Sequence, residues 1–271
     1  MQVALAGCST IDDPDEPALV AALDRLGVRA TGVPWDADVD WSAYDLVVVR
    51  STWDYVERLP EFLAWADSVP RLANPAAVLR WNTDKHYLAE LAAAGVPVVP
   101  TTYVEGEFVP PPGEYVVKPT VSAAAMDTAR YGPGDDAAAT AHVERLRAAG
   151  RGVLVQPYLR AVEEHDETSL LFLGGVFSHG AMKGPVLVGD RALTPVETVI
   201  GPRDPSAAER AVAEQVLSVV REPLLYARVD LLPGPDGPLL LELELTEPFL
   251  FLDMAEGAKD RFASAIAGWR P

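Results

Sequence analysis

Two glutamates stand two residues apart in an apolar run near the carboxyl end of the chain, "LLELEL". Successive side chains of a β-strand point to opposite faces, so Glu242 and Glu244 share one face. Arg228 and Asp230, in "YARVDLL", have the same spacing, and the Gly/Pro-rich segment between the two runs predicts an antiparallel hairpin. If the polar faces match, three carboxylates and an arginine gather on one patch, where the carboxylates repel one another unless a cation lies between them.

This patch is a candidate magnesium site, because Mg²⁺ takes oxygen ligands and usually binds through one or two carboxylates plus substrate phosphates. Its ligands would be Asp230, Glu242 and Glu244. The plain alternative is a half-exposed strand whose acidic face binds no metal. Glu247 stands three residues beyond Glu244 and next to Pro248, outside the alternation. We expect it to face substrate or solvent rather than the metal.

Two lysines occupy positions that are unusual for a lysine, and a bound anion would explain both positions. Lys118 ends the apolar strand "YVVKP", and Lys85 opens the helix "WNTDKHYLAELAAAG", which Asn82 or Thr83 can cap. Cations are disfavoured at the positive end of a helix dipole, and a bound phosphate would remove that conflict at Lys85. Either lysine taken alone is equally explained as an ordinary structural or surface residue.

Two further segments could contact a nucleotide. The small, polar loop "TVSAAAMDTARYGPG", which contains Ser122, could cover phosphates through its backbone N–H groups, or it could be a plain connection. The strand "VLVQPYL" runs into Gln-Pro and leaves backbone groups that an adenine ring could use. A simple strand end explains it as well.

Composition limits the classes of partner. The chain has 271 residues and a net charge of −18, which argues against a nucleic-acid surface and against anionic lipid. The single cysteine, Cys8, excludes an internal disulfide and favours a reducing compartment. "LAGC" resembles a lipoprotein processing site, but only seven residues precede the cysteine and none is basic. We therefore expect a cytoplasmic protein without a membrane-spanning segment.

The elements that must position these residues follow an α/β pattern. In residues 1–75, "QVALAG" and "YDLVVVR" predict buried strands, and "PALVAALDRLG" and "LPEFLAWADSV" predict amphipathic helices. This alternation predicts a parallel sheet covered on both faces, and prolines 70 and 75 suggest a boundary. Further on, "TSLLFLGGVFSHGAMK" predicts a hairpin turning at two glycines, and helices are expected over 135–149, 206–221 and the end of the chain.

In this order the motifs resemble an ATP-grasp ligase. A helix-borne lysine, a strand lysine with a flexible loop, a hinge and a metal-binding strand pair run from about residue 80 to 250. The resemblance implies an α/β fold with an N-terminal pre-ATP-grasp domain at 1–78 and an ATP-grasp domain at 79–271. The latter would divide into a lid at about 100–157 and a catalytic subdomain at 158–271.

The resemblance also implies a role for each matching residue, with ATP and Mg²⁺ as cofactors and Mn²⁺ as a substitute metal. Arg228 would stabilise the phosphorylated intermediate, and Lys183 would line the substrate site. ATP would contact Lys85, Lys118, Ser122, Gln156, Tyr158, Leu159 and Glu167, and the metal would be held by Asp230, Glu242 and Glu244. Two features depart from the family: many members have Glu-x-Asn where this chain has Glu-Leu-Glu, and the loop has alanines where glycines are common.

Within that superfamily, "RSTWDY" and "KPTVSAAAMDTARY" are most similar to a branch that includes a cyclo-ligase forming D-cycloserine from O-ureido-D-serine. "RSTWDY" follows a buried strand, at the sheet edge where open parallel sheets bind ligands. Its polar side chains could bind an amino acid; they are Arg50, Ser51, Thr52 and Asp54. The alternative is a capped helix start with Trp53 and Tyr55 as packing aromatics.

The function that the resemblance implies is ATP-dependent activation of a small, amino-acid-like carboxylate as an acyl phosphate, followed by attack of a nitrogen. That nitrogen belongs to the same molecule, closing a ring, or to a second one, forming an amide, and only "RSTWDY" favours the ring. A phosphotransferase or a non-catalytic ATP- or amino-acid-binding regulator are the alternatives. A regulator predicts eroded metal carboxylates or a lost Arg228, and all are intact. A homodimer, common in that superfamily, is left open.

Overall fold

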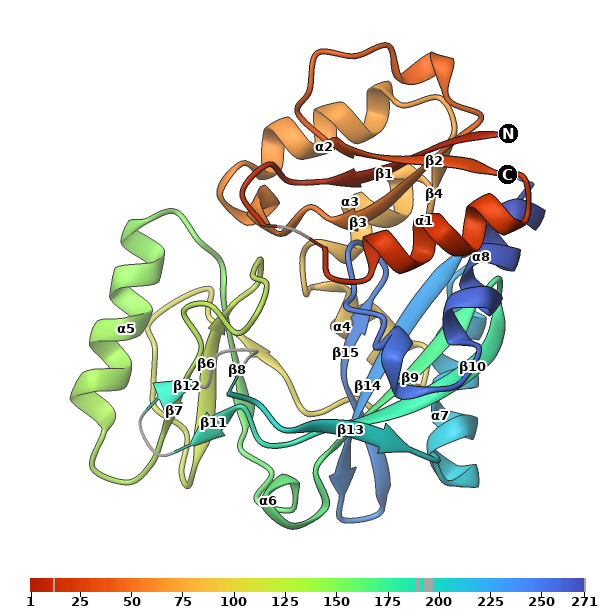
Figure 1. The fold of residues 1–271 in the computed structure, drawn as a ribbon. Coiled ribbons are helices and arrows are strands. Elements are labelled where there is room, and N and C mark those ends of the chain that lie inside the picture. Colours follow the sequence, from red (N-terminus) through yellow and green to blue (C-terminus); the bar gives the residue numbers. More distant parts are fainter. Residues whose placement is uncertain (12, 189–190, 193–196, 271) are drawn as a thin grey trace.

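The computed structural model describes residues 1–11, 13–188, 191–192 and 197–270, and its first sheet is parallel, in the order β2-β1-β3-β4 (Figure 1). Its strands are β1 (Gln2–Gly7), β2 (Arg29–Pro34), β3 (Leu46–Ser51) and β4 (Leu72–Ala73). The helices here are α1 (Glu16–Arg25), η1 (Trp41–Ala43), η2 (Trp53–Glu57) and α2 (Leu59–Ser68). The predicted strand–helix alternation is confirmed, although β2 carries no clear apolar pattern and is added only by the structure.

Alternate residues of this sheet pack against different helices. Val3 and Leu5 of β1 join the cluster that contains Leu19 of α1 and Phe262 of α8 (Ala258–Gly268). Ala4 and its neighbours on the same face join the cluster formed with α2. Both faces of the sheet are apolar and are covered by helices, as is usual for a parallel sheet. The last helix, α8, thus packs against the first, α1.

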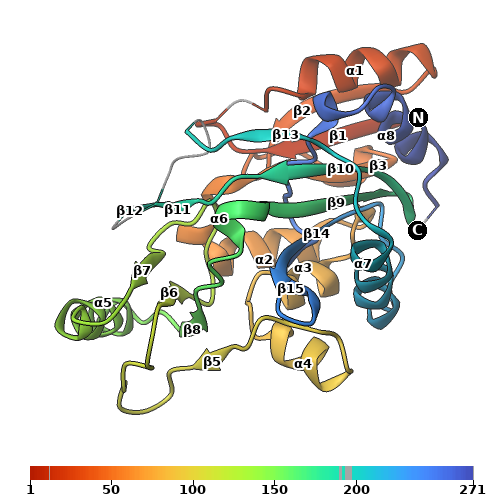
Figure 2. The same cartoon turned by 90° about the horizontal axis from the view of Figure 1, so that it is seen from below.

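The second sheet is antiparallel, in the order β5-β8-β6-β7. Its strands are β5 (Thr102–Tyr103), β6 (Tyr115–Pro119), β7 (Ala129–Tyr131) and β8 (Val153–Pro157). Helix α5 (Asp136–Ala148) packs on it through a separate small apolar cluster that includes Val143 and Leu146. Figures 1 and 2 both show this layer to one side of the rest of the molecule.

The third sheet is also antiparallel, in the order β13-β10-β9-β14-β15. Its strands are β9 (Glu167–Leu173), β10 (Val176–Lys183), β13 (Ile200–Arg203), β14 (Tyr226–Gly234) and β15 (Gly237–Glu244). The β9–β10 hairpin turns at Gly174 and Gly175, whose φ values of 60° and 78° favour glycine. The remaining elements are the strand pair β11 (Leu187–Val188) and β12 (Arg191–Ala192), α6 (Val162–His165), α7 (Ala207–Val219) and η3 (Leu252–Met254). Both hairpins predicted for this region are confirmed.

The predicted helix around Lys85 is broken in the structure. Helix α3 (Ala76–Asn82) ends before the lysine, and α4 (Tyr87–Ala93) begins after it. Asn82 caps neither helix through its side chain, because its amide donates to the Leu243 carbonyl at 2.7 Å and accepts from the Leu245 N–H at 2.7 Å. Lys85 therefore lies in a turn, and the helix-dipole reason for an anion beside it does not apply.

Asn74 joins the parallel sheet to the β14–β15 hairpin. It is fully buried, with a φ of 57° that asparagine tolerates better than most residues, and its amide donates to the Tyr226 and Leu245 carbonyls at 2.9 and 2.7 Å. Its side-chain oxygen accepts from the Leu225 N–H at 2.8 Å. Since one apolar cluster also spans both regions, the division at residue 78 stays a prediction. None of the described helices combines the length and apolarity that a membrane span needs.

Candidate active site

A cleft of about 720 Å³ lies between the second and third sheets and reaches η2 of the N-terminal region. It collects residues from segments that are far apart in the sequence. The predicted site residues that line it are Lys85, Lys118, Ser122, Gln156, Tyr158, Leu159, Glu167, Lys183, Arg228, Glu242 and Glu244. Most of the predicted site is therefore brought together around one cavity.

The β14–β15 hairpin aligns its charged residues as the alternation predicts. Arg228 is paired across the strands with Glu244, and Asp230 with Glu242. The Arg228 guanidinium donates to both Asp230 oxygens and to the Glu244 carboxylate. Burial raises the pKa of Glu244 to about 7 and outweighs the opposing effect of Arg228. An arginine thus already compensates part of the carboxylate repulsion.

The metal set predicted from the sequence divides into two kinds of residue. Glu242 and Glu244 line the cleft with side chains 26% and 27% exposed, whereas the Asp230 side chain is 1% exposed and bonded to Arg228. Among the described residues, no three Asp, Glu, His or Cys side chains converge as a metal site. Two cleft-facing carboxylates still match the way Mg²⁺ binds together with substrate phosphates. Glu242 and Glu244 therefore fit such an ion better than Asp230 does.

The two predicted phosphate lysines have different surroundings. The Lys85 ammonium lies 3.0 Å from a Glu242 oxygen and donates to the Ser122 carbonyl and hydroxyl at 3.0 and 3.3 Å. Lys118 is buried, and among the described residues its ammonium has neither an ion-pair nor a hydrogen-bond partner. Burial lowers the pKa of Lys118 to about 8 despite the opposing effect of Glu242. A cation buried without a partner is costly unless an anion joins it.

The loop after Lys118 adopts an unusual backbone. Ala124, Ala125 and Asp127 have φ values of 50°, 56° and 53°, a region that costs ordinary L-residues free energy. Arg145 and Arg151 both bind the Asp127 carboxylate and fix the end of the loop. The alanines that replace family glycines therefore adopt a backbone that glycine favours, and they line the cleft.

The hinge segment supplies an apolar wall. Gln156 is buried, and its amide donates to the Thr101 hydroxyl at 2.9 Å. Tyr158 stacks under the Arg130 guanidinium at 3.6 Å, while Leu159 joins a small apolar cluster with Val162. This wall is suited to a flat apolar ring, with strand-edge backbone groups beside it.

Glu167 and Lys183 form a buried pair at one side of the cleft. The Lys183 ammonium lies 2.5 Å from a Glu167 oxygen and 3.8 Å from Asp230. Burial raises the pKa of Glu167 to about 7, although Lys183 opposes this. Lys183 thus has its charge matched within the protein.

The polar residues of "RSTWDY" are not among the described residues that line this cleft. Arg50 is buried against Asp13, with an Nη2–Oδ2 distance of 3.0 Å, and Asp54 accepts from the Trp35 indole N–H at 2.9 Å. None of Arg50, Ser51, Thr52 and Asp54 is among the described residues that line the cleft. Arg50, Ser51 and Thr52 are buried, and the predicted contact of these four residues with a substrate stays a prediction.

Trp53 and Tyr55 line the cleft instead. The Trp53 indole donates to the Glu247 carbonyl at 3.2 Å, and the Tyr55 hydroxyl lies near the Glu247 carboxylate. Burial, reinforced by Glu244, raises the pKa of Glu247 to about 8. In the alternative interpretation of "RSTWDY" both aromatics are packing residues, and the only sequence signal for a place in the cleft is their position directly after a buried strand.

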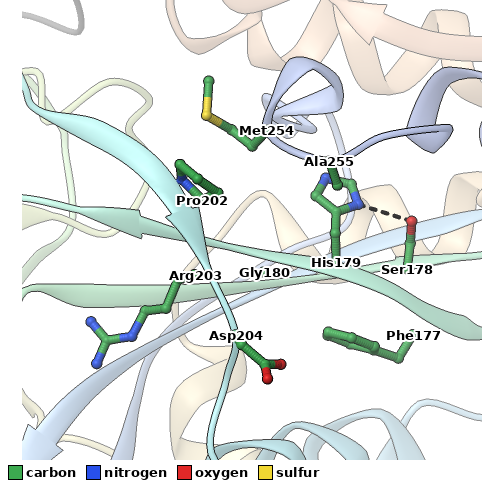
Figure 3. Close-up of a pocket in the computed structure, with 9 residues that line it drawn as sticks. All are labelled: Phe177, Ser178, His179, Gly180, Pro202, Arg203, Asp204, Met254 and Ala255. Atoms are coloured by element: carbon green, nitrogen blue, oxygen red, sulfur yellow. Dashed lines mark hydrogen bonds between the residues drawn. The ribbon is translucent and has the colours of Figure 1, made fainter.

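A second hollow, of about 390 Å³, lies over β10 and β13 (Figure 3). Its histidine is hydrogen-bonded within the protein. His179 Nδ1 lies 2.8 Å from the Ser178 hydroxyl, and Nε2 lies 3.0 Å from the Leu250 carbonyl. No predicted site residue lines it. The larger cleft is therefore the candidate active site.

Known proteins resemble the chain over almost its full length. Residues 3–74 match the family described as D-cycloserine synthetase DcsG, N-terminal domain. The cycloserine biosynthesis protein DcsG of Streptomyces lavendulae is 41% identical over 279 residues, covering 94% of this chain and 93% of that protein.

Two solved structures place the fold. The crystal structure of D-cycloserine synthetase DcsG is 38% identical, covers 98% of this chain and 99% of its own, and has a TM-score of 0.90. The D-alanine–D-alanine ligase of Bacillus anthracis complexed with ATP is 13% identical, covers 98% and 96%, and has a TM-score of 0.67. The predicted ATP-grasp fold is confirmed. The chain is an ATP-dependent ligase that belongs to the D-cycloserine synthetase family of ATP-grasp enzymes.

Proposed function

We propose that the cleft binds Mg·ATP and activates the carboxylate of a small amino-acid-like substrate, whose own nitrogen then closes a ring. The observation that carries this proposal is the combination of Lys118, a buried cation without a partner among the described residues, with two cleft-facing carboxylates, Glu242 and Glu244. The ATP phosphates need a cation such as Lys118, and a magnesium ion needs carboxylate ligands such as Glu242 and Glu244. Both requirements are met in one cavity.

We assign the phosphates to the end of the cleft near Lys118 and Lys85. Lys118 would gain the anionic partner that its burial calls for, and Lys85 would remain oriented by Glu242 and Ser122. The strained loop that begins with Ser122 would cover the phosphates, and the wall formed by Gln156, Tyr158 and Leu159 would take the adenine ring. Glu167 would lie toward the ribose or the nearby substrate.

Glu242 and Glu244 would hold Mg²⁺, or Mn²⁺ in its place, with Asp230 orienting the arginine that faces them. Such an ion offsets the charge of the ATP phosphates during phosphoryl transfer. Arg228 is already fixed by Asp230, by Glu244 and by the Phe249 carbonyl, which lies 3.0 Å from its Nη1. A guanidinium held in advance stabilises developing oxyanion charge without having to reorganise during the reaction.

The chemistry has two stages. The substrate carboxylate attacks the γ-phosphorus, giving an acyl phosphate and ADP, and a nitrogen then attacks the acyl carbon and expels phosphate. The names of the relatives favour an intramolecular nitrogen, as in the conversion of O-ureido-serine to cycloserine. That conversion also requires one water, with the carbamoyl group leaving as carbon dioxide and ammonia. An intermolecular carboxylate–amine ligase of the D-alanine–D-alanine type is the second candidate, supported by the shared fold alone.

A screen of ADP release tests this proposal. The enzyme with Mg·ATP is offered O-ureido- and aminooxy-amino acids and ordinary amino acids, first singly and then in pairs. We expect turnover with a single ureido-type substrate and, by mass spectrometry, a cyclic product that is lighter than this substrate by carbon dioxide and ammonia. Turnover only with pairs would favour the intermolecular ligase, and a stable phosphorylated product would contradict ligation.

The cellular location and the partners of the enzyme are predictions from composition. The single cysteine favours a cytoplasmic location, and the charge of −18 favours small-molecule partners over nucleic acid or membrane. A homodimer is left open.

A further inference from the structure

Most charged side chains of the cleft have their charges matched inside the protein. Three of its four lining glutamates have a cation: Glu242 has Lys85 at 3.0 Å, Glu167 has Lys183 at 2.5 Å, and Glu244 has Arg228. Glu247 differs, because among the described residues no ion-pair partner lies within reach of its carboxylate. Lys85 acts on it only from a longer range and is already bound to Glu242.

Two aromatic residues lie at Glu247. The Tyr55 hydroxyl lies near its carboxylate, and the Trp53 indole N–H donates to its backbone carbonyl at 3.2 Å. Pro248 follows it and restricts the chain. Trp53, Tyr55, Phe249 and Phe251 line the same cleft. A half-buried carboxyl group in a cleft lined by aromatic residues favours a bound cation, which would also stabilise its ionised form.

The position of Glu247 suits a group next to the reacting carboxylate. Arg228, the proposed oxyanion group, contacts the Phe249 carbonyl at 3.0 Å, so the 247–249 segment lies beside the acyl centre. In an α-amino acid the ammonium is attached one carbon away from the carboxylate. A substrate placed with its carboxylate toward Arg228 therefore brings its α-ammonium toward this segment.

We infer that Glu247, supported by Tyr55, binds the α-ammonium group of the substrate and thereby restricts the enzyme to α-amino acids. This inference rests on the proposed activation of the substrate carboxylate in the same cleft. The ammonium takes no part in ring closure, since the nitrogen that attacks belongs to the side chain. Glu247 is thus a substrate-binding residue and leaves the ATP end of the cleft unchanged.

Glu247→Gln keeps the size of the side chain and removes its charge. A charged hydrogen bond contributes about 1.5–3 kcal/mol, so we expect KM for the amino-acid substrate to rise by about 10- to 100-fold. The KM for ATP should stay within about twofold of the wild-type value. Glu222→Gln, the same exchange at an exposed glutamate, is the matched control and should change neither constant.

A des-amino substrate separates binding from a structural role. With the ureido compound that lacks the α-ammonium, wild-type enzyme and Glu247→Gln should have equal kcat/KM within about twofold, because the group that Glu247 binds is missing. If the variant loses as much activity on this compound as on the amino acid, Glu247 does not bind the ammonium and the inference fails.

Two outcomes distinguish this inference from the proposed function. If wild-type enzyme releases no ADP with any amino-acid substrate, the proposed function fails; if it does and Glu247→Gln keeps the wild-type KM, only the ammonium site fails. Should thermal unfolding show that Glu247→Gln is misfolded, Tyr55→Phe is compared with wild type on the same two compounds. Its loss must be confined to the compound that carries the ammonium, and an equal loss on both overturns the inference.

Discussion

Glu242→Gln should lower ATP-dependent turnover by at least about 100-fold. Residues that only orient a metal ligand change activity by up to about 100-fold when they are replaced, and a direct ligand should matter at least as much. The exchange keeps the shape of the side chain but removes a charge that faces the cleft and lies 3.0 Å from the Lys85 ammonium. Both a proposed magnesium ligand and the partner that orients a proposed phosphate lysine are lost together. The measurement is the rate of ADP release at saturating ATP over a titration of Mg²⁺.

The magnesium titration decides the cause of the loss. If Glu242 holds the metal, the variant should need more Mg²⁺ for half-maximal activity, and the exposed control Glu222→Gln should match wild type. Wild-type activity and wild-type magnesium dependence in Glu242→Gln would show that the metal assignment is wrong.

Lys118→Ala should weaken ATP binding by about 10- to 100-fold, since a charged hydrogen bond contributes about 1.5–3 kcal/mol. The lysine is buried and has no partner among the described residues, so its removal relieves the fold of an unmatched charge while it removes a phosphate contact. We therefore expect lower affinity without lower thermal stability. Lys259→Ala, at a lysine that does not line the cleft, is the matched control for titration calorimetry, and an unchanged affinity in Lys118→Ala would exclude the phosphate role.

The same lysine predicts a pH dependence. Burial lowers its pKa to about 8 in the free protein, so the ammonium is charged below that pH and neutral above it. Phosphate binds the charged form, and ATP affinity should fall as the pH rises from 7 to 9.5, with proton uptake on binding above pH 8. Lys118→Arg keeps its charge over this range and should lose that dependence. The same decline in Lys118→Arg would mean that another group causes it.

Local patterns were sufficient to predict the β14–β15 hairpin. Glu242 and Glu244 alternate with leucines, and the structure pairs them with Asp230 and Arg228 across β14 and β15. The period of two specifies both the strand and the shared face, and it requires no knowledge of distant residues. The antiparallel pairing follows from the short Gly/Pro turn.

Long-range partners explain what local patterns missed. Asn82 looks like a helix cap in the sequence, yet its amide is used by the backbone of residues 243 and 245. Arg50 looks available after its strand, but Asp13 lies against it once the loop after β1 folds over. Trp53 and Tyr55 resemble packing residues until the distant Glu247 meets them. Each of these contacts joins segments that no short window of sequence relates.

Transfer of ¹⁸O from substrate to phosphate tests the central claim most directly. A ureido-type amino acid labelled with ¹⁸O in both carboxylate oxygens is incubated with the enzyme and Mg·ATP. The ¹⁸O content of the phosphate and of the product is then measured by mass spectrometry. Because the acyl phosphate retains a carboxylate oxygen on its bridge to phosphorus, each phosphate should carry one ¹⁸O and each cyclic product should keep one. Phosphate released without label, alongside product formation, would contradict carboxylate activation in this cleft.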